Sequence, residues 1–170
     1  MGANNKAFLA LDLSRPVSDS ITRPANTTAY AAGDAVSDTG GDAHFAFVEC
    51  LHRGLTSGEI VAARITSTAG GVGTALDAEL WLFHTDVTAV ADNASWTLSD
   101  AQALTRVAII EFPTADWRLN ANNCTCDVYP NQPFSGIGAD RTLYGQLVAR
   151  NAYNPTSGET FTVELVFANY

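Results

Sequence analysis

The stretch richest in residue types capable of catalysis is FHTDVTAVADNASWTLSD, which begins at Phe83. It contains His84, Asp86, Asp92 and Ser95, the residue types of a nucleophilic triad. A triad needs three side chains that converge from a rigid scaffold, and the sequence has no nucleophile elbow such as G-x-S-x-G. Its Asp and Asn residues are typical of turns. We therefore interpret the stretch as a polar connection between two strands, and we expect no enzymatic activity.

Cys124 and Cys126 in NNCTCD come closest to a metal-binding pattern. Both thiols of a C-x-C pair on a strand face the same side, so a metal site would need two further ligands. Cys50, His44 and His52 are the only plausible donors, and the second ligand pair that zinc sites usually show is absent. We expect free, buried cysteines, no metal site and no cofactor. The odd number of cysteines favours a reducing origin over a secreted disulfide framework.

A carbohydrate-binding platform would need exposed aromatic side chains. We expect Trp81 and Trp96 to pack in the core or an interface, as tryptophans usually do. Trp117 in TADWRLN and Tyr129 are the candidate exposed aromatics beside a polar groove. They leave open a second function, that of a virion-borne carbohydrate-binding or host-adhesion module on a tail or head fibre.

Composition excludes several classes of partner. The chain has 170 residues, which fits one domain, with 18 acidic against 9 basic residues and a net charge of −9. No cluster of Lys and Arg could neutralise a phosphate backbone, so we expect no nucleic-acid partner. No apolar run approaches the length of about 18 residues that a membrane helix requires, and we expect a soluble protein without a signal peptide.

From residue 43 onward the dominant pattern is alternation of apolar and polar residues, typical of half-buried strands. Residues 160–169 show it most clearly, and residues 142–151 follow the same rule. In residues 59–67 the alternation places Val61, Ala63 and Ile65 on one face. The more apolar segments DAELWLFH and TRVAIIEF are expected to be central strands covered on both faces.

Clusters of Gly, Pro, Asn and Asp separate these segments, with a spacing that fits seven or eight short strands. Helical periodicity is weak, and Ser99 with Gln102 predicts a capping box on about one turn of helix. The predicted fold is all-β: a two-sheet antiparallel β-sandwich, jelly-roll-like, with an extended N-terminal arm.

Residues 1–40 differ from the rest in composition, being rich in Pro, Ser, Thr, Asn and Gly. Pro16 and Pro24 favour extended backbone before them, which suits a segment lying along another surface. Only residues 34–37 look like a short strand. We therefore expect an arm over residues 1–40 and the sandwich over residues 41–170.

Three stretches together resemble a family of small virion proteins of tailed bacteriophages. They are RPANTTAYAAGDAVSD near the N-terminus, LWLFHTDVTAVADNASWTLSDAQALTRVAIIEF in the middle, and YGQLVARNAYNPTSGETFTVELVFANY at the end. The resemblance keeps the order of its parts, and it leaves residues 119–134, LNANNCTCDVYPNQPF, without a strong counterpart.

The resemblance implies a capsid decoration, or cement, protein on the outer surface of the virion, made in the cytoplasm of the host bacterium. Its partners would be the major capsid protein and further copies of itself, as a homotrimer or a dimer. An arm that orders on binding needs apolar anchors, each of which contributes about 1.5 to 3 kcal/mol when buried. The candidate anchors are Phe8, Leu9, Leu11, Leu13, Ile21 and Tyr30.

Overall fold

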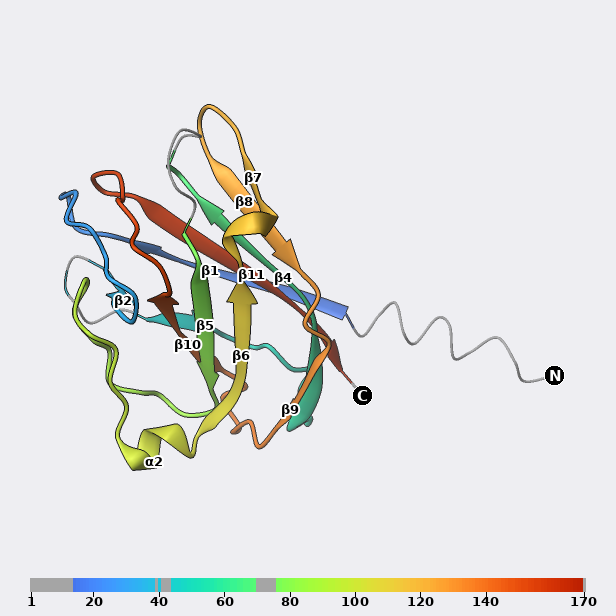
Figure 1. Cartoon of the computed structure of the whole chain (residues 1–170). Coiled ribbons are helices and arrows are strands. Elements are labelled where there is room, and N and C mark those ends of the chain that lie inside the picture. Colours follow the sequence, from blue (N-terminus) through green and yellow to red (C-terminus); the bar gives the residue numbers. More distant parts are fainter. Residues whose placement is uncertain (1–13, 39, 41–43, 70–75, 170) are drawn as a thin grey trace.

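The computed structural model describes residues 14–38, 40, 44–69 and 76–169, and it is a sandwich of two antiparallel sheets (Figure 1). The larger sheet has six strands in the order β1–β11–β4–β8–β7, with β9 also paired to β4. The smaller sheet has five in the order β2–β10–β5–β6, with β3 also paired to β10. The all-β, jelly-roll-like sandwich predicted from the alternating pattern is thereby confirmed.

The strands in chain order are β1 (Ser14–Thr22), β2 (Ala35–Val36), β3 (Phe45–Phe47), β4 (Ser57–Ser67), β5 (Ala78–Phe83), β6 (Arg106–Phe112), β7 (Trp117–Leu119), β8 (Cys124–Val128), β9 (Gln132–Ser135), β10 (Leu143–Ala149) and β11 (Thr160–Asn169). The described residues thus form eleven strands rather than seven or eight. Residues 34–37, expected as a short strand, contain β2. The strands that the sequence did not predict include β7 and β9, which have three and four residues and are too short to show a clear period in the sequence.

The core lies between the sheets and is built by the alternation of the long strands. Every second residue of β11 is buried, from Phe161 to Asn169. The smaller sheet contributes Leu80 and Leu82 of β5 and Leu147 of β10 to this core, and all three are fully buried. Gly145 of β10 lies in a tight part of this core, because an added Cβ would lie 3.1 Å from side-chain atoms of both Leu80 and Phe47.

The loop between β5 and β6 covers part of the outer face of the smaller sheet. The connection from β5 to β6 packs against the smaller sheet, where Trp96 lies edge-on to Phe83 and donates its backbone N–H to the carbonyl of Gly33 (2.8 Å). This connection contains α2 (Asp100–Ala103), whose capping box between Ser99 and Gln102 confirms the prediction. A 3-10 helix, η1 (Thr114–Asp116), leads from β6 into β7. No helix in the described ranges has the length and apolarity needed to cross a membrane.

Two sequence expectations about individual strands are wrong. TRVAIIEF forms β6, which among the described strands pairs with β5 alone and is therefore an edge strand rather than a central one. In β4, Ile60 replaces Val61 on the core face, because the register against β11 shifts between Val166 and Phe167 and leaves Val61 as the extra residue of a β-bulge. An alternating pattern cannot show where a strand inserts one residue.

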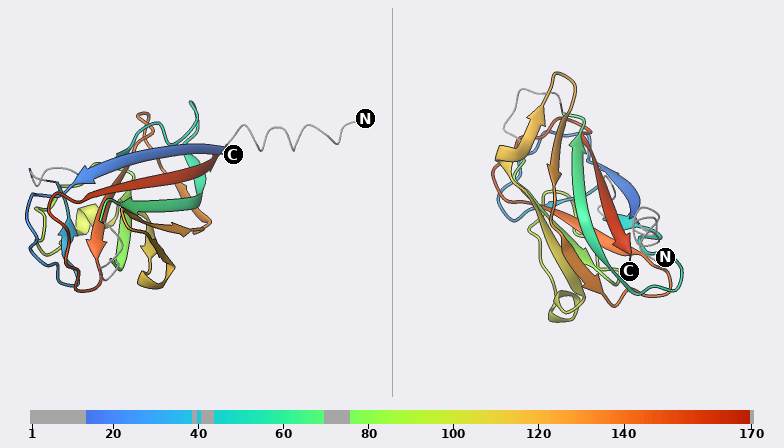
Figure 2. Two further views of the ribbon diagram at one scale, coloured as in Figure 1. Left: turned by 90° about the horizontal axis from the view of Figure 1, so that it is seen from above. Right: turned by 90° about the vertical axis from the view of Figure 1, so that its right-hand side faces the viewer.

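Residues 14–38, expected within the arm, are integral to the sandwich. β1 pairs along its whole length with β11, and Figure 2 (left) shows β1, β11 and β4 side by side. The alternation of β1 escaped the sequence interpretation because its inward positions are Arg15, Val17, Asp19 and Ile21, of which only two are apolar. The remainder of the expected arm, residues 1–13, lies outside the described residues together with the candidate anchors that it contains.

β1 is an edge strand with features that discourage pairing to another sheet. Pro16 lacks a backbone N–H, and the N–H of Ser20 is donated to the carboxylate of Asp19 (2.8 Å). The other carboxylate oxygen of Asp19 accepts the N–H of Ala46 in β3 (2.7 Å), which ties this edge to the smaller sheet. Proline and inward-pointing charges are known means of protecting sheet edges.

We expect a chain lacking residues 1–13 to fold, because β1 remains complete, whereas a chain lacking residues 1–40 should not. The longer deletion exposes the edge of β11 and removes the buried residues Ile21, Tyr30 and Val36. Circular dichroism melting would show a cooperative transition for the first variant within a few degrees of the full chain. A cooperative melt of the second would contradict the integral role of residues 14–38.

Candidate functional site

The structure separates the four residues considered for a catalytic triad. The Nε2 of His44, not His84, lies 3.0 Å from Asp86. Asp92 instead accepts hydrogen bonds from Arg23 and Tyr30, and Ser95 forms an isolated β-bridge with Asp34. The stretch is a connection between β5 and β6, as interpreted from its turn residues.

The cysteines are free and buried. Cys124 and Cys126 lie in β8 at positions that face the core, and Cys50 is distant in sequence at the end of the β3 turn. Within residues 14–38, 40, 44–69 and 76–169, no group of three or more His, Cys, Asp or Glu side chains could hold a metal ion. Burial raises the pKa of Cys50 to about 12 and that of Cys126 to about 11, so both thiols are protonated at neutral pH.

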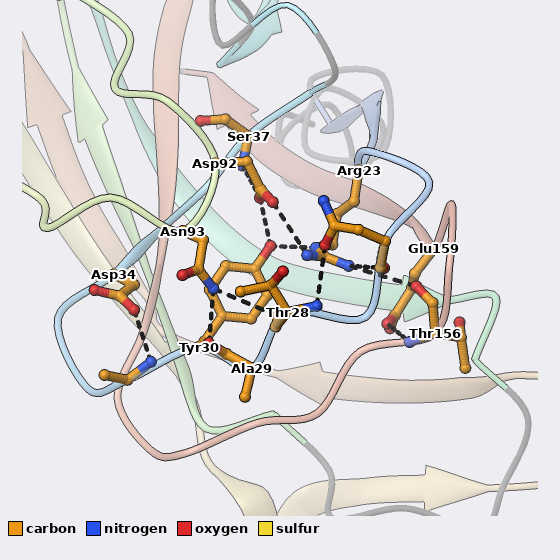
Figure 3. A network of polar contacts seen from close by, with 12 residues as sticks. Arg23, Thr28, Ala29, Tyr30, Asp34, Ser37, Asp92, Asn93, Thr156 and Glu159 are labelled. Atoms are coloured by element: carbon orange, nitrogen blue, oxygen red, sulfur yellow. Dashed lines mark hydrogen bonds and ion pairs between the residues drawn. The ribbon is translucent and has the colours of Figure 1, made fainter.

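The most elaborate polar site surrounds the guanidinium of Arg23, which follows β1 directly and is fully buried (Figure 3). Its Nη2 lies 3.1 Å from Oδ2 of Asp92, and its Nε donates to the hydroxyl of Tyr30. The Nη1 donates to the carbonyls of Asn26 (3.5 Å) and Thr156 (3.4 Å). Every nitrogen of the guanidinium therefore has an acceptor, as a buried cation requires.

Asp92 is the counter-ion of Arg23, and it also accepts hydrogen bonds from two other residues. Its Oδ1 accepts hydrogen bonds from the hydroxyl of Tyr30 and from the backbone N–H of Ser37 (3.1 Å), while Oδ2 faces Arg23. The next residue, Asn93, adopts a positive φ of 62° and donates its side-chain amide to the carbonyl of Ala29 (2.8 Å). The loop after β5 is thus fastened to the segment after β1.

A second carboxylate, that of Glu159, completes the site from the connection between β10 and β11. It is buried and accepts hydrogen bonds from Tyr153 Oη (2.6 Å), the N–H of Thr156 (3.1 Å) and the hydroxyl of Ser67. The ring of Tyr153 stacks on that of Tyr30, with centroids 6.4 Å apart. Burial first, and then the hydrogen bonds to Asp92 and Glu159, raise the pKa of Tyr30 and of Tyr153, so both phenols stay protonated as donors.

These residues come from all three stretches that carry the family resemblance. Arg23 and Tyr30 belong to the first stretch, Asp92 to the second, and Tyr153 with Glu159 to the third. We call the five residues the Arg23 network. Arg23 and Asp92 pair with each other, and Glu159 is held by neutral donors, so the network holds three loops together.

The sequence did not identify Arg23 or Glu159 as functional residues. A single Arg or Glu in a polar segment resembles any solvated side chain, and its burial depends on loops that meet only in the fold. The available signal was that both residues lie within the stretches that carry the family resemblance.

The residues predicted to contact a capsid or a ligand differ in their burial. Ile21 and Tyr30 are buried within the chain itself, because β1 and the following loop belong to the sandwich. Trp117 is also buried, with 6% of its surface exposed, since it begins β7 opposite Cys126 and faces the core. The expectation of an exposed Trp117 is therefore wrong, whereas Tyr129 is 74% exposed. Phe8, Leu9, Leu11 and Leu13 lie outside the described residues.

No protein-family model matches the sequence, and no curated protein matches it. Among solved structures, the chain is similar to one from a full particle of Israeli acute paralysis virus heated to 63 degrees, with a TM-score of 0.34, 10% identity, and coverage of 98% of this chain and 79% of that one. It is also similar to a chain of the pentamer of the same virus, with a TM-score of 0.30, 13% identity, and coverage of 96% of this chain and 91% of that one. A third similar chain comes from the native virion of Kashmir bee virus, with a TM-score of 0.32, 9% identity, and coverage of 99% of this chain and 78% of that one. The pairing of the strands themselves defines the β-sandwich.

Replacing Arg23 with Met should lower the free energy of unfolding by about 3 to 5 kcal/mol, because it leaves the carboxylate of Asp92 buried without its cation. The matched control is Arg64→Met, which removes an exposed ion pair with Asp127 and should cost about 0 to 1 kcal/mol. Urea denaturation measures the free energy of unfolding of both variants. Equal losses in the two variants would contradict the central role of Arg23.

The protonated thiols and phenols also predict a dependence of stability on pH. In the unfolded chain, thiols and phenols lose protons from pH about 8.5 and about 10 respectively, whereas the folded chain retains them to higher pH. The stability they contribute should be complete below pH about 8.5 and should decline toward pH about 12. Denaturation between pH 7 and 11 measures the decline, and rapid reaction of native Cys50 or Cys126 with a thiol reagent at neutral pH would contradict the proposed burial effect.

Proposed function

We propose that this chain is a capsid decoration protein of the tailed-phage type, which binds the outer face of the head shell and stabilises contacts between major capsid subunits. The observation that carries the proposal is the convergence of the three resembling stretches in the Arg23 network. Residues that lie far apart in the sequence share one structural task, which supports a common scaffold rather than three independent likenesses.

The form of the molecule supports such a role. The Arg23 network and the two-sheet core support a stiff body. A protein repeated over a symmetric shell gains stability through many weak contacts acting together. Such a protein needs a defined surface and a rigid scaffold more than a deep pocket.

Binding to the shell would use residues 1–13 as the arm, with Phe8, Leu9, Leu11 and Leu13 as apolar anchors. Ile21 and Tyr30 leave the set of proposed contacts because they are buried within the sandwich. The protected edge of β1 disfavours assembly by extension of the larger sheet, so a homotrimer would form through other surfaces or through the arm.

The decisive experiment is co-sedimentation of the purified full chain with undecorated shells of the phage that encodes it, followed by imaging of the decorated particles. The full chain should bind at local threefold positions, and the chain lacking residues 1–13 should bind at least about tenfold more weakly, since each lost anchor contributes more than 1.4 kcal/mol. Mass measurement in solution would report the trimer.

A variant with Asn4 and Asn5 changed to Ala is the matched control, because it alters the same segment without removing an apolar anchor. It should bind as the full chain does. Undiminished binding of the shortened chain would refute the role of the arm, and a position on the tail instead of the shell would refute decoration.

A further inference from the structure

The larger sheet is interrupted in its middle, where three neighbouring strands lose their regular pairing together. β4 pairs with β8 up to Ala63 opposite Val128, and with β9 from Ile60 opposite Gln132. Residues 129–131 therefore bulge opposite residues 61–62, on the same level as the register shift between β4 and β11. Bulges often lie beside binding sites, because they redirect side chains and free backbone groups from the ladder.

A depression of about 80 Å³ lies on the outer face at this interruption. Its apolar lining is made by small side chains, among them Ala62 and Val166, which stand opposite one another in β4 and β11. Tyr129 lines it as well and is 74% exposed. By this measure one water molecule needs about 10–15 Å³, so the depression has room for several water molecules or for a substituent of a ligand.

Charged groups of both signs form the rest of the lining. Glu164, Arg64 and Asp127 stand side by side across β11, β4 and β8. Arg64 Nε donates to Asp127 Oδ1 (2.6 Å), and Nη1 lies 3.9 Å from Glu164 Oε1. The hydrogen bond to Asp127 raises the pKa of Arg64, so this row keeps its guanidinium charged and offers hydrogen-bond donors and acceptors together.

We propose that Tyr129, Arg64, Asp127 and Glu164 form a binding site for a neutral carbohydrate. The apolar face of a pyranose ring would lie on the exposed ring of Tyr129, with one substituent in the depression. Its hydroxyl groups would accept hydrogen bonds from the guanidinium and donate to the carboxylates. An exposed aromatic surface combined with a few fixed polar groups is the general composition of a small-molecule site.

The charge arrangement selects the neutral class of ligand. Two carboxylates against one guanidinium repel an anionic sugar, and both carboxylates already face Arg64, which weakens their attraction for a lysine or arginine side chain of a protein partner. A polyol needs no net charge and uses both kinds of hydrogen-bonding group. Tyr129 and Asp127 also lie in residues 119–134, the stretch outside the family resemblance, as expected for a property particular to this chain.

The test uses the full chain and an array of neutral glycans, followed by titration of a bound glycan monitored by NMR of the protein. Tyr129→Ala should weaken binding about tenfold or more, because it removes the stacking surface and the side chain that lines the depression. Tyr129→Phe keeps the ring and should bind nearly as the full chain does.

Leu119→Ala is the matched control, since Leu119 is an exposed apolar residue of the same stretch at the far end of the β7–β8 pair. It should leave binding unchanged, and circular dichroism should show all three variants folded. The proposal is overturned if no neutral glycan binds in solution, if Tyr129→Ala binds as well as the full chain, or if lysine-rich peptides bind in place of glycans. Because these variants retain residues 1–13, shell binding reports on decoration separately.

Discussion

The buried charge of Arg23 is the constraint on which the rest of the structure depends. A guanidinium removed from water is tolerated only when a counter-ion and a full set of acceptors surround it. Asp92 supplies the counter-charge from the β5–β6 connection, and Thr156 supplies a carbonyl from the β10–β11 connection. One cation therefore joins three loops, and Figure 3 shows them meeting around it.

That constraint explains why polar segments behave as parts of the core. The segment after β1 has the composition of a solvated linker, yet Tyr30 and Val36 within it are buried. Glu159 extends the same arrangement, because its carboxylate collects donors from Tyr153, Thr156 and Ser67. The described loops at this end of the sandwich are thus held by buried hydrogen bonds, apart from the surfaces proposed to bind partners.

The two proposed binding surfaces have different physical origins. Residues 1–13 would contribute apolar area that is ordered on binding, a mode that suits attachment to a large repeated shell. The site around Tyr129 arises inside a sheet, where the bulge at Val61 and the break between β8 and β9 leave room for a ligand. Neither surface shares residues with the Arg23 network, so changes in binding can be separated from changes in stability.

The sequence by itself determined the class of fold, because alternation over long strands such as β11 requires one face in water and one in a core. It also determined the one-turn helix, through the local capping box of Ser99 and Gln102. Only the tertiary structure decided that β1 belongs to the sheet, that Trp117 faces inward and that Arg23 meets Asp92. Those outcomes depend on which backbones lie side by side, and long-range pairing and the burial of a single charge leave no periodic trace in the chain.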